Sequence, residues 1–248
     1  MAQHTDPTTL VDTDAMRRFH HTVYGRLPWP EDAVVGVALM TAAGKMVRTD
    51  RRPVADVDGF VDLCVKAVTA GCNCYVNVAP QRPGLGVSTR GKKKDSYGLP
   101  ALFADVDTSD GVHAAVGKPG VAPYPTVAEA LRLISTLPLP VSLLVHTGGG
   151  FHVWCCFEDE PLDHASDAGI EVIKRWSSAV KRIFDAAGRN VDVGVLGDPA
   201  RMLRVPGTIN FKSAEPKPVR LLGDAGQEPE WWAREIEDWL AAQIPPAA

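Results

Sequence analysis

The sequence contains no long uninterrupted hydrophobic run, although 45% of its 248 residues are hydrophobic. None of its apolar stretches approaches the roughly 20 residues that a transmembrane helix needs. The N-terminal residues MAQHTDPTTL also lack the basic and apolar regions of a signal peptide. These absences argue against a membrane protein and predict a cytoplasmic one. The apolar content is sufficient for a buried core in one domain or in two fused lobes.

Cysteines are few, and their spacing is not that of zinc ligands. The five are Cys64, Cys72, Cys74, Cys155 and Cys156. Structural zinc sites typically use pairs of cysteines with two to four residues between them, whereas this chain has CxC and CC. Most of these cysteines lie in apolar runs. We therefore expect reduced, mostly buried thiols and no structural zinc.

A positive net charge is also absent, because 26 Lys and Arg face 30 Asp and Glu, giving a formal charge of −4 at pH 7. A protein that coats DNA without sequence preference is expected to be basic, so this balance argues against that class. It does not exclude an enzyme with a local basic channel, because active-site carboxylates themselves add negative charge.

Basic residues are nevertheless concentrated in two places. The first group, Arg90, Lys92, Lys93 and Lys94, lies in a Gly-rich segment before an apolar strand, where we expect a mobile loop. For this loop, phosphate binding and mere solubility are both open interpretations. The second group lies on an expected helix over 165–187 and is interpreted as a solvated face.

Two aspartates one residue apart are the most informative feature that is present. Asp105 and Asp107 follow the mostly apolar residues 99–104, as at the end of a buried strand. Side chains at positions i and i+2 of a strand share a face, so both carboxylates converge while Val106 turns into the core. Adjacent carboxylates repel unless a positive charge lies between them, and Mg²⁺ or Mn²⁺ is the usual solution. The alternative is a solvated strand end or an Asx turn before Thr108.

A second segment, residues 146–154, places three glycines between two apolar strands. Glycines there permit positive φ and a close backbone approach to a ligand, but a simple hairpin turn is the alternative. His152 alternates with Phe151 and Val153 and therefore faces the other way, either as a structural residue or as a ligand. The run has neither the Lys-Ser/Thr of a P-loop nor the Rossmann glycine spacing.

A third segment, residues 190–212, carries Asp192 and Asp198, followed by basic residues around a Pro-Gly turn. The basic residues are Arg201, Arg204 and Lys212. Arginine forks bind phosphates bidentately and lysine acts as a point charge, so this density suits a polyphosphate. An ordinary loop with solvated charges is the alternative for any one of these residues.

Taken together and in this order, the three segments resemble the archaeo-eukaryotic primase superfamily, most closely the bifunctional primase–polymerase domains of phages and plasmids. The shared pattern is Asp-x-Asp, then Gly-Gly-Phe-His, then Arg-x-x-Arg-x-Pro-Gly-Thr-x-Asn-x-Lys, over roughly residues 74–212. The final string is the most specific part and Asp-x-Asp the least. One departure is Asn210, which stands where many primases have histidine.

The resemblance implies roles for individual residues. Asp105, Asp107 and Asp192 match the acidic residues that hold two divalent cations, Mg²⁺ or Mn²⁺, with Asp198 as an alternative to Asp192. His152 matches the histidine that contacts the phosphates of the incoming nucleotide. Further phosphate contacts match Arg201, Arg204 and Lys212. In this context the basic loop is expected to meet phosphates of the template or of the triphosphate.

The function implied by the resemblance is that of a template-dependent nucleotidyltransferase, which makes primers and extends DNA or RNA strands in phage or plasmid replication. Its partners would be a single-stranded DNA template and NTP or dNTP, in the host cytoplasm if the protein is phage-encoded. The terminal Pro-Pro-Ala-Ala is typical of a linker, so a longer polypeptide with a further domain such as a helicase is expected. One alternative is a template-independent nucleotidyltransferase. Another is a non-catalytic RRM-like module for single strands, but Phe151 and Tyr75 are too few aromatics to favour it.

The pattern of helices and strands predicts an α+β fold. The order around the motifs, strand–helix–strand–strand–helix–strand, is that of a ferredoxin- or RRM-like module. We expect one primase–polymerase domain over 1–248, with an N-terminal α/β lobe at about 31–100, a catalytic module at 101–225 and a closing helix at 228–244. The expected helices cover 9–24, 57–70, 127–137, 165–187 and 229–244. The expected strands cover 34–40, 74–78, 99–107, 140–145, 151–157 and 219–222.

Overall fold

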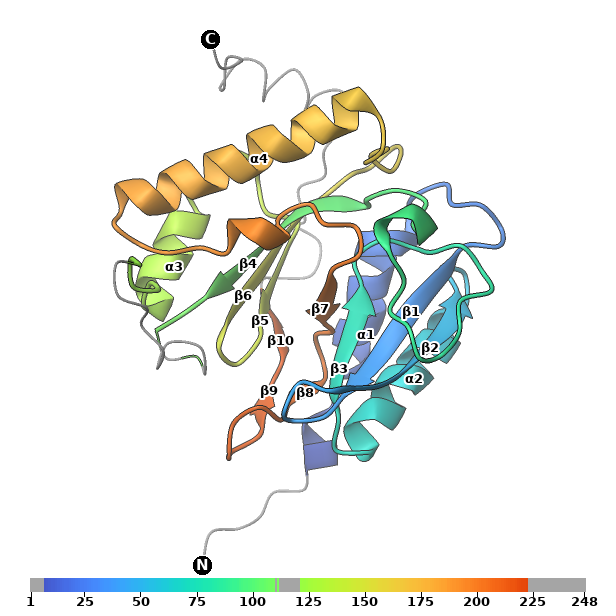
Figure 1. Ribbon diagram of the computed structural model, residues 1–248. Helices are drawn as coiled ribbons and strands as arrows, with labels where there is room; N and C mark the ends of the chain where they lie inside the picture. Colours follow the sequence, from blue (N-terminus) through green and yellow to red (C-terminus); the bar gives the residue numbers. More distant parts are fainter. Residues whose placement is uncertain (1–6, 110, 112–120, 223–248) are drawn as a thin grey trace, which may run out of the picture.

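Two antiparallel four-stranded sheets lie side by side (Figure 1). The three sequence motifs lie on strands of these sheets and on the segments that connect them. The computed structural model describes residues 7–109, 111 and 121–222, and the expected closing helix at 228–244 lies outside them. No helix within these residues is long and apolar enough to cross a membrane. The described part has the mixed α+β architecture expected from the sequence.

The first sheet has the strand order β2-β1-β3-β7. Its strands are β1 (Val34–Met40), β2 (Met46–Pro53), β3 (Asn73–Asn77) and β7 (Met202–Arg204). The β1 sequence VVGVALM is apolar, and its five central residues are buried. The short strand β7 comes from far along the chain, yet it pairs with β3 in a register that places Arg204 opposite Tyr75. The first sheet is therefore completed by the third motif.

Two helices pack beside this sheet. They are α1 (Thr13–His20), which follows a 3-10 turn at Pro7–Leu10 and continues into a π-helical turn at His21–Gly25, and α2 (Val57–Thr69). The side chain of Asp12 caps α1 by accepting from the amide of Ala15, and Asp56 caps α2 through Gly59. In α2 the apolar residues recur at helical spacing and are buried against β1 and β3.

The second sheet has the order β10-β5-β6-β4. Its strands are β4 (Ala101–Asp107), β5 (Leu143–His146), β6 (Gly150–Cys156) and β10 (Arg220–Leu222). Because β4 and β5 both run antiparallel to β6, they are parallel to each other and separated by it. The final strand, β10, lies at the β5 edge of the sheet. The elements of this sheet follow the expected strand–helix–strand–strand–helix–strand order, but three short strands of the other sheets are inserted between the second helix and the last strand.

The helices between these strands are α3 (Val127–Ile134) and α4 (Asp167–Ala186), which lie beside the second sheet in Figure 1. The amphipathic helix α4 begins at Ser166, whose hydroxyl accepts from the amide of Gly169. Its indole at Trp176 is fully buried and donates to the carbonyl of Phe103 in β4 at 2.9 Å. This bond fixes the helix over the strand that carries the two aspartates.

The two sheets share one hydrophobic core. Phe19 of α1 meets Trp154 of β6 edge to face, with ring centroids 5.4 Å apart. A small third sheet pairs β8 (Ile209–Asn210) with β9 (Lys217–Pro218) near the place where the two larger sheets meet. All five cysteines are free thiols, and every one except Cys72 is buried, as expected.

The sequence missed one strand of regular length. The sequence of strand β2 is polar, because four of its eight residues are charged. The strand lies at the edge of the first sheet, where charged side chains are tolerated. The expected helix over 9–24 is divided, with its last turn in the π conformation. The division into an N-terminal lobe at about 31–100 and a catalytic module at 101–225 remains a prediction. Strand β7 lies within the range expected for the catalytic module, yet it joins the first sheet.

Candidate active site

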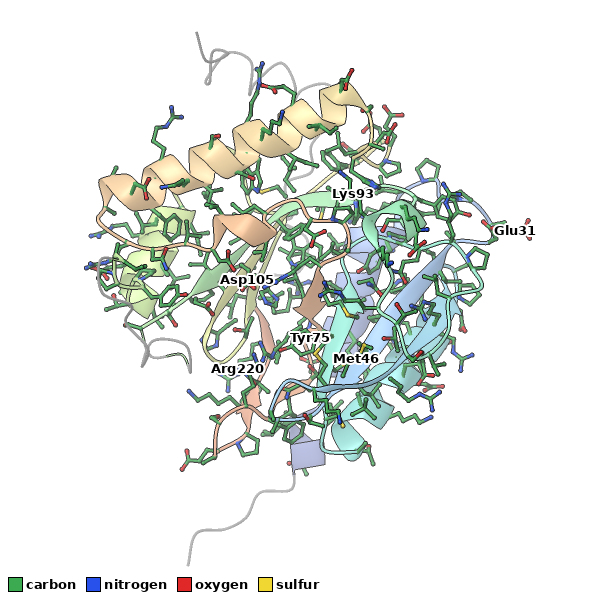
Figure 2. All side chains as sticks on the ribbon, in the orientation of Figure 1. Glu31, Met46, Tyr75, Lys93, Asp105 and Arg220 are labelled. Atoms are coloured by element: carbon green, nitrogen blue, oxygen red, sulfur yellow. The ribbon has the colours of Figure 1, made fainter. Side chains whose placement is uncertain are left out.

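A polar cavity of about 300 Å³ lies between the two sheets. Seven residues that match the metal and nucleotide ligands of the primase superfamily line it: Asp105, Asp107, His152, Asp192, Arg201, Arg204 and Lys212. In Figure 2, Asp105 lies on one side of the central region and Tyr75, another lining residue, on the side of the first sheet. Residues from three separate sequence segments are thus brought to one place.

The acidic pair comes from the end of β4. Asp105 and Asp107 both line the cavity, whereas Val106 between them is fully buried, as the two-residue period of a strand predicts. Across the sheet, Asp105 is paired with His152 and Asp107 with Gly150. A side chain at position 150 would collide with the backbone, since a Cβ there would lie 2.3 Å from the carbonyl oxygen of Val106. Close packing of the strands is therefore one reason for glycine at this position.

Asp105 is held by a cation from the third motif. The Nη2 of Arg201 donates to Oδ2 of Asp105 at 2.8 Å, and Nε2 of His152 lies 3.7 Å from Oδ1. Burial alone raises the pKa of Asp105, but His152, Arg201 and Arg204 outweigh burial and hold the pKa below its usual value. Asp105 is therefore a carboxylate at neutral pH.

His152 is buried and uncharged at neutral pH. Burial lowers its pKa to about 4, and the positive charges of Arg204 and Arg201 add to this effect while Asp105 opposes it. Arg201 is therefore the full positive charge that contacts Asp105 near neutrality. In its neutral form His152 can donate or accept a hydrogen bond but adds no charge to the cavity.

Arg204 is fixed in the wall of the cavity opposite the aspartates. Its guanidinium lies over the ring of Tyr75, 4.8 Å from the centroid, and its Nη2 donates to Oδ1 of Asn210 at 3.3 Å. Only 8% of the residue is exposed, and burial lowers its pKa. Even so it remains charged, because an arginine side chain does not lose its proton in proteins. The site thus has a rigid, pre-oriented cation.

Asn210 joins the second and third motifs. Its Nδ2 donates to the carbonyl of Thr147 at 2.7 Å, and its Oδ1 accepts from the amide of Lys212 at 3.0 Å. Gly148 in the same turn has φ +83°, and a Cβ there would lie 2.9 Å from Cβ of Lys217. The departure from histidine at position 210 therefore supplies an amide that fastens the glycine turn to the lysine-bearing loop.

The two candidate third aspartates are placed differently. Asp192 lines the cavity, and its carboxylate also accepts from the amide of Gly194, where it caps a 3-10 helix at Val193–Val195. Asp198 caps the amide of Ala200 and is not among the residues that line the cavity. The geometry therefore favours Asp192 over Asp198 as a partner of the acidic pair.

The acidic residues offer ligands suited to a hard divalent cation, since carboxylate oxygens are the donors that Mg²⁺ and Mn²⁺ take. Burial raises the pKa of Tyr124, and Asp107, Asp192 and Asp105 each raise it further, so all three act on one point of the cavity. However, within 7–109, 111 and 121–222 no group of three His, Cys, Asp or Glu side chains is close enough to hold a metal ion. The carboxylates in the cavity lining are therefore donors of the type that such a cation takes, although the described side chains are not gathered in a group of three around one point.

The basic loop lies apart from the cavity. Arg90, Lys92, Lys93 and Lys94 are all exposed, and none lines the cavity. Lys93, which begins a 3-10 helix at Lys93–Asp95, is labelled away from Asp105 in Figure 2. The structure therefore does not bring these four residues to the predicted nucleotide site.

The backbone at the start of this loop makes hydrogen bonds to side chains from elsewhere in the chain. Carbonyl oxygens along it accept from buried or half-buried side chains: Arg51 donates to Thr89 at 2.7 Å, and Gln81 and Asn77 donate to Arg90 at 2.7 and 2.9 Å. A Gly-rich sequence carries no signal for such distant donors. These hydrogen bonds hold the start of the loop against the first sheet, while its basic side chains are exposed.

Several lining residues were not predicted as site residues, and three of them are tyrosines or a lysine. Tyr75 was considered only as a possible stacking aromatic, and Tyr124 and Lys217 were not considered. Lys217 could have been noticed as a basic residue shortly after the third motif. Tyr75 and Tyr124 carry no local signal, because each reaches the cavity from an element outside the motifs.

The comparisons with known proteins agree with this architecture. No protein-family model matches the sequence, and no curated protein is similar to it. Among solved structures, the primase–polymerase domain of cyanophage S-2L aligns at a TM-score of 0.53 with 16% identity, covering 93% of this chain and 99% of that one.

A second neighbour is the catalytic domain of the primase RepB′, solved in complex with initiator DNA. It aligns at a TM-score of 0.52 with 14% identity over 94% of each chain. Another structure of RepB′ aligns at 0.51 with 13% identity, over 92% of this chain and 63% of that one. The chain therefore has the fold of primase–polymerase catalytic domains of the archaeo-eukaryotic primase type.

Proposed function

We propose that this protein is a template-dependent nucleotidyltransferase, a primase–polymerase that joins nucleotides on a single-stranded DNA template with Mg²⁺ or Mn²⁺. The observation that carries the proposal is the single cavity in which acidic residues of β4 face basic residues of the third motif. The fold of the S-2L and RepB′ domains supports it.

The charge arrangement suits nucleotidyl transfer. A nucleoside triphosphate is strongly anionic, so fixed cations must position it in line with the attacking hydroxyl. Arg204, buried against Tyr75, and Lys212 would bind phosphate oxygens from the wall of the cavity. Neutral His152 would donate a hydrogen bond to a phosphate oxygen without adding charge beside Asp105.

Asp105, Asp107 and Asp192 would hold the divalent cations. When bound, such cations activate the 3′-hydroxyl of the growing strand and stabilise the leaving pyrophosphate. The carboxylates contribute the negative charge that retains them, and Val106 anchors the two β4 ligands in the core.

A non-catalytic module that stacks bases on its sheet is less compatible with the structure. Such a module needs exposed aromatic side chains, but Phe151 is only 1% exposed and packs against His146. Tyr75 is occupied by the guanidinium of Arg204. Phe151 is thus too buried to stack on a base, and a cation already lies over the ring of Tyr75.

The test is a primer-synthesis assay with labelled nucleotide, Mn²⁺ and single-stranded template. Template-directed products support the proposal, untemplated tails indicate a template-independent transferase, and binding without products indicates a binding module. Asp107→Asn should abolish synthesis while the protein remains folded, because the change relieves carboxylate repulsion. The matched control is Asp198→Asn, because Asp198 is an acidic residue of the third segment that lies outside the cavity lining. Near-normal synthesis by Asp107→Asn would overturn the metal assignment.

A further inference from the structure

The ion pair between Arg201 and Asp105 joins two residues that the proposed reaction needs for different ligands. Asp105 is a metal ligand in that proposal and Arg201 a phosphate ligand, yet here Nη2 of Arg201 lies 2.8 Å from Oδ2 of Asp105. The side chains are 30% and 21% exposed, so water screens the pair only partly. An arginine thus occupies Oδ2 of Asp105, one of the two carboxylate oxygens that a metal ion could take.

In this contact Arg201 uses only part of its hydrogen-bonding capacity. Its Nε is buried and has no hydrogen-bond partner among the described residues, and its bond to Asp105 is made through one terminal nitrogen rather than as a bidentate fork. Nε of Arg204 likewise has no partner among the described residues, but Arg204 is only 8% exposed and its guanidinium is held by Tyr75 and Asn210, whereas the Arg201 side chain is 30% exposed. Of these two arginines, Arg201 is the one that can change partners at low cost.

We propose that Arg201 acts as an internal counter-ion that blocks free metal from Asp105 and releases it when a nucleoside triphosphate arrives. This inference rests on the proposed function and adds an order of binding to it. A free divalent cation must displace the guanidinium and leave it unpaired in a partly buried place, which is unfavourable. Triphosphate oxygens offer Arg201 a bidentate anionic partner, so the exchange becomes favourable when metal and nucleotide arrive together.

The device has a thermodynamic signature. Because coupling is reciprocal, nucleotide should strengthen metal binding by the same factor by which metal strengthens nucleotide binding. In any such site, a metal ion chelated by the triphosphate couples metal binding to nucleotide binding to some extent. The contribution of Arg201 is the part of this coupling that disappears when its side chain is replaced. That contribution can be measured without catalysis.

The experiment measures Mn²⁺ binding to the whole protein by electron paramagnetic resonance, first without nucleotide. Arg201→Gln should bind free Mn²⁺ about tenfold more tightly than wild type, a change of about 1.4 kcal/mol. Lys212→Gln is the matched control, because it removes the same charge from the same cavity and leaves the hydrogen bond from Arg201 to Asp105 in place. Its effect on the affinity for free Mn²⁺ should stay below about threefold, or about 0.65 kcal/mol. With a non-hydrolysable triphosphate present, the gain in Mn²⁺ affinity should be larger in wild type than in Arg201→Gln.

Equal Mn²⁺ affinity of wild type and Arg201→Gln, or an equal rise in Arg201→Gln and Lys212→Gln, would overturn the inference while leaving the proposed function intact. The absence of Mn²⁺ binding in every protein, with and without nucleotide, would instead overturn the proposed metal site. Adding Asp105→Asn to Arg201→Gln should remove the increase in affinity. Arg201→Met, which also lacks the charge, provides a second test of the same outcomes if Arg201→Gln does not fold.

Discussion

The buried histidine at the end of α1 makes the stability of this protein depend on pH in a way that can be calculated. His20 is fully buried, with its ring 4.8 Å from that of Phe60 and 5.4 Å from that of Tyr24 between centroids. Neither ring nitrogen has a hydrogen-bond partner within the described residues. Burial lowers the pKa of His20 from 6.5 to about 4, with a smaller lowering by His21 and an opposing effect of Asp56.

The sign follows from which state binds the proton. Below pH 6.5 the unfolded chain protonates this histidine, whereas the folded protein does so only near pH 4. The folded protein, in which His20 is neutral, therefore has its full stability above pH 6.5 and loses stability as the pH falls from 6.5 to 4. With 1.36 kcal/mol per pKa unit, the loss from His20 between pH 7 and pH 5 is about 2 kcal/mol.

Urea unfolding at pH 7 and pH 5 measures this loss. His20→Phe keeps a ring of similar shape and cannot be protonated, so its free energy of unfolding should fall by about 2 kcal/mol less than that of wild type over this interval. His152 also has a pKa of about 4, but it contributes equally to both proteins and cancels. His21→Phe, at the exposed neighbouring position, is the control: it keeps the buried His20 and removes only the smaller contribution of His21 to its pKa, so it should retain most of the wild-type loss. Equal losses in His20→Phe and wild type would refute the argument.

Three further predictions concern the cavity, the basic loop and the acid side of the stability curve. Lys212→Ala should weaken nucleotide binding by about 1.5–3 kcal/mol, seen in KM and kcat with template affinity little changed; an unaltered KM would contradict the assignment. Replacing the three lysines at 92–94 with Ala should flatten the salt dependence of template binding, by roughly 0.7 in log–log slope for each phosphate that these lysines neutralise, and an unchanged slope with unchanged synthesis would leave the loop a solubility feature. Glu129 forms an ion pair with Arg189, and hydrogen bonds from Arg189 and Thr126 lower its pKa to about 2. The stabilisation by this pair is present above pH 4.5 and is lost toward pH 2, so the melting temperature of Glu129→Gln should fall less than that of wild type between pH 5 and pH 3; parallel curves would argue against a role for the pair.

Local sequence patterns predicted the elements that carry the chemistry. The two-residue period at the end of β4 placed Asp105 and Asp107 on one face, and burial of Val106 shows why. The helices expected over 57–70 and 165–187 match α2 and α4 to within a few residues. In both cases the determining interactions lie within a few residues along the chain, so the pattern is visible in the sequence.

Other parts of the site depended on contacts between distant residues. The pairing of β7 with β3 sets Arg204 over Tyr75, and the support of the basic loop comes from Arg51, nearly 40 residues before the carbonyl it binds. Strand β2 was missed because its charged residues resemble a loop until β1 supplies the hydrogen bonds. None of these pairings leaves a signature in the segments that it joins.

The sequence by itself therefore determined the identity and order of the charged residues, the faces of the strands and the extents of the main helices, because these follow from the local period and capping of the chain. The tertiary structure alone decided that Arg201 reaches Asp105 across 96 positions of sequence, that His152 is buried enough to be neutral, and that Asp192 rather than Asp198 lines the cavity. The physical reason is that charge state and partner choice are set by burial and by neighbours in space, and packing of the two sheets supplies both.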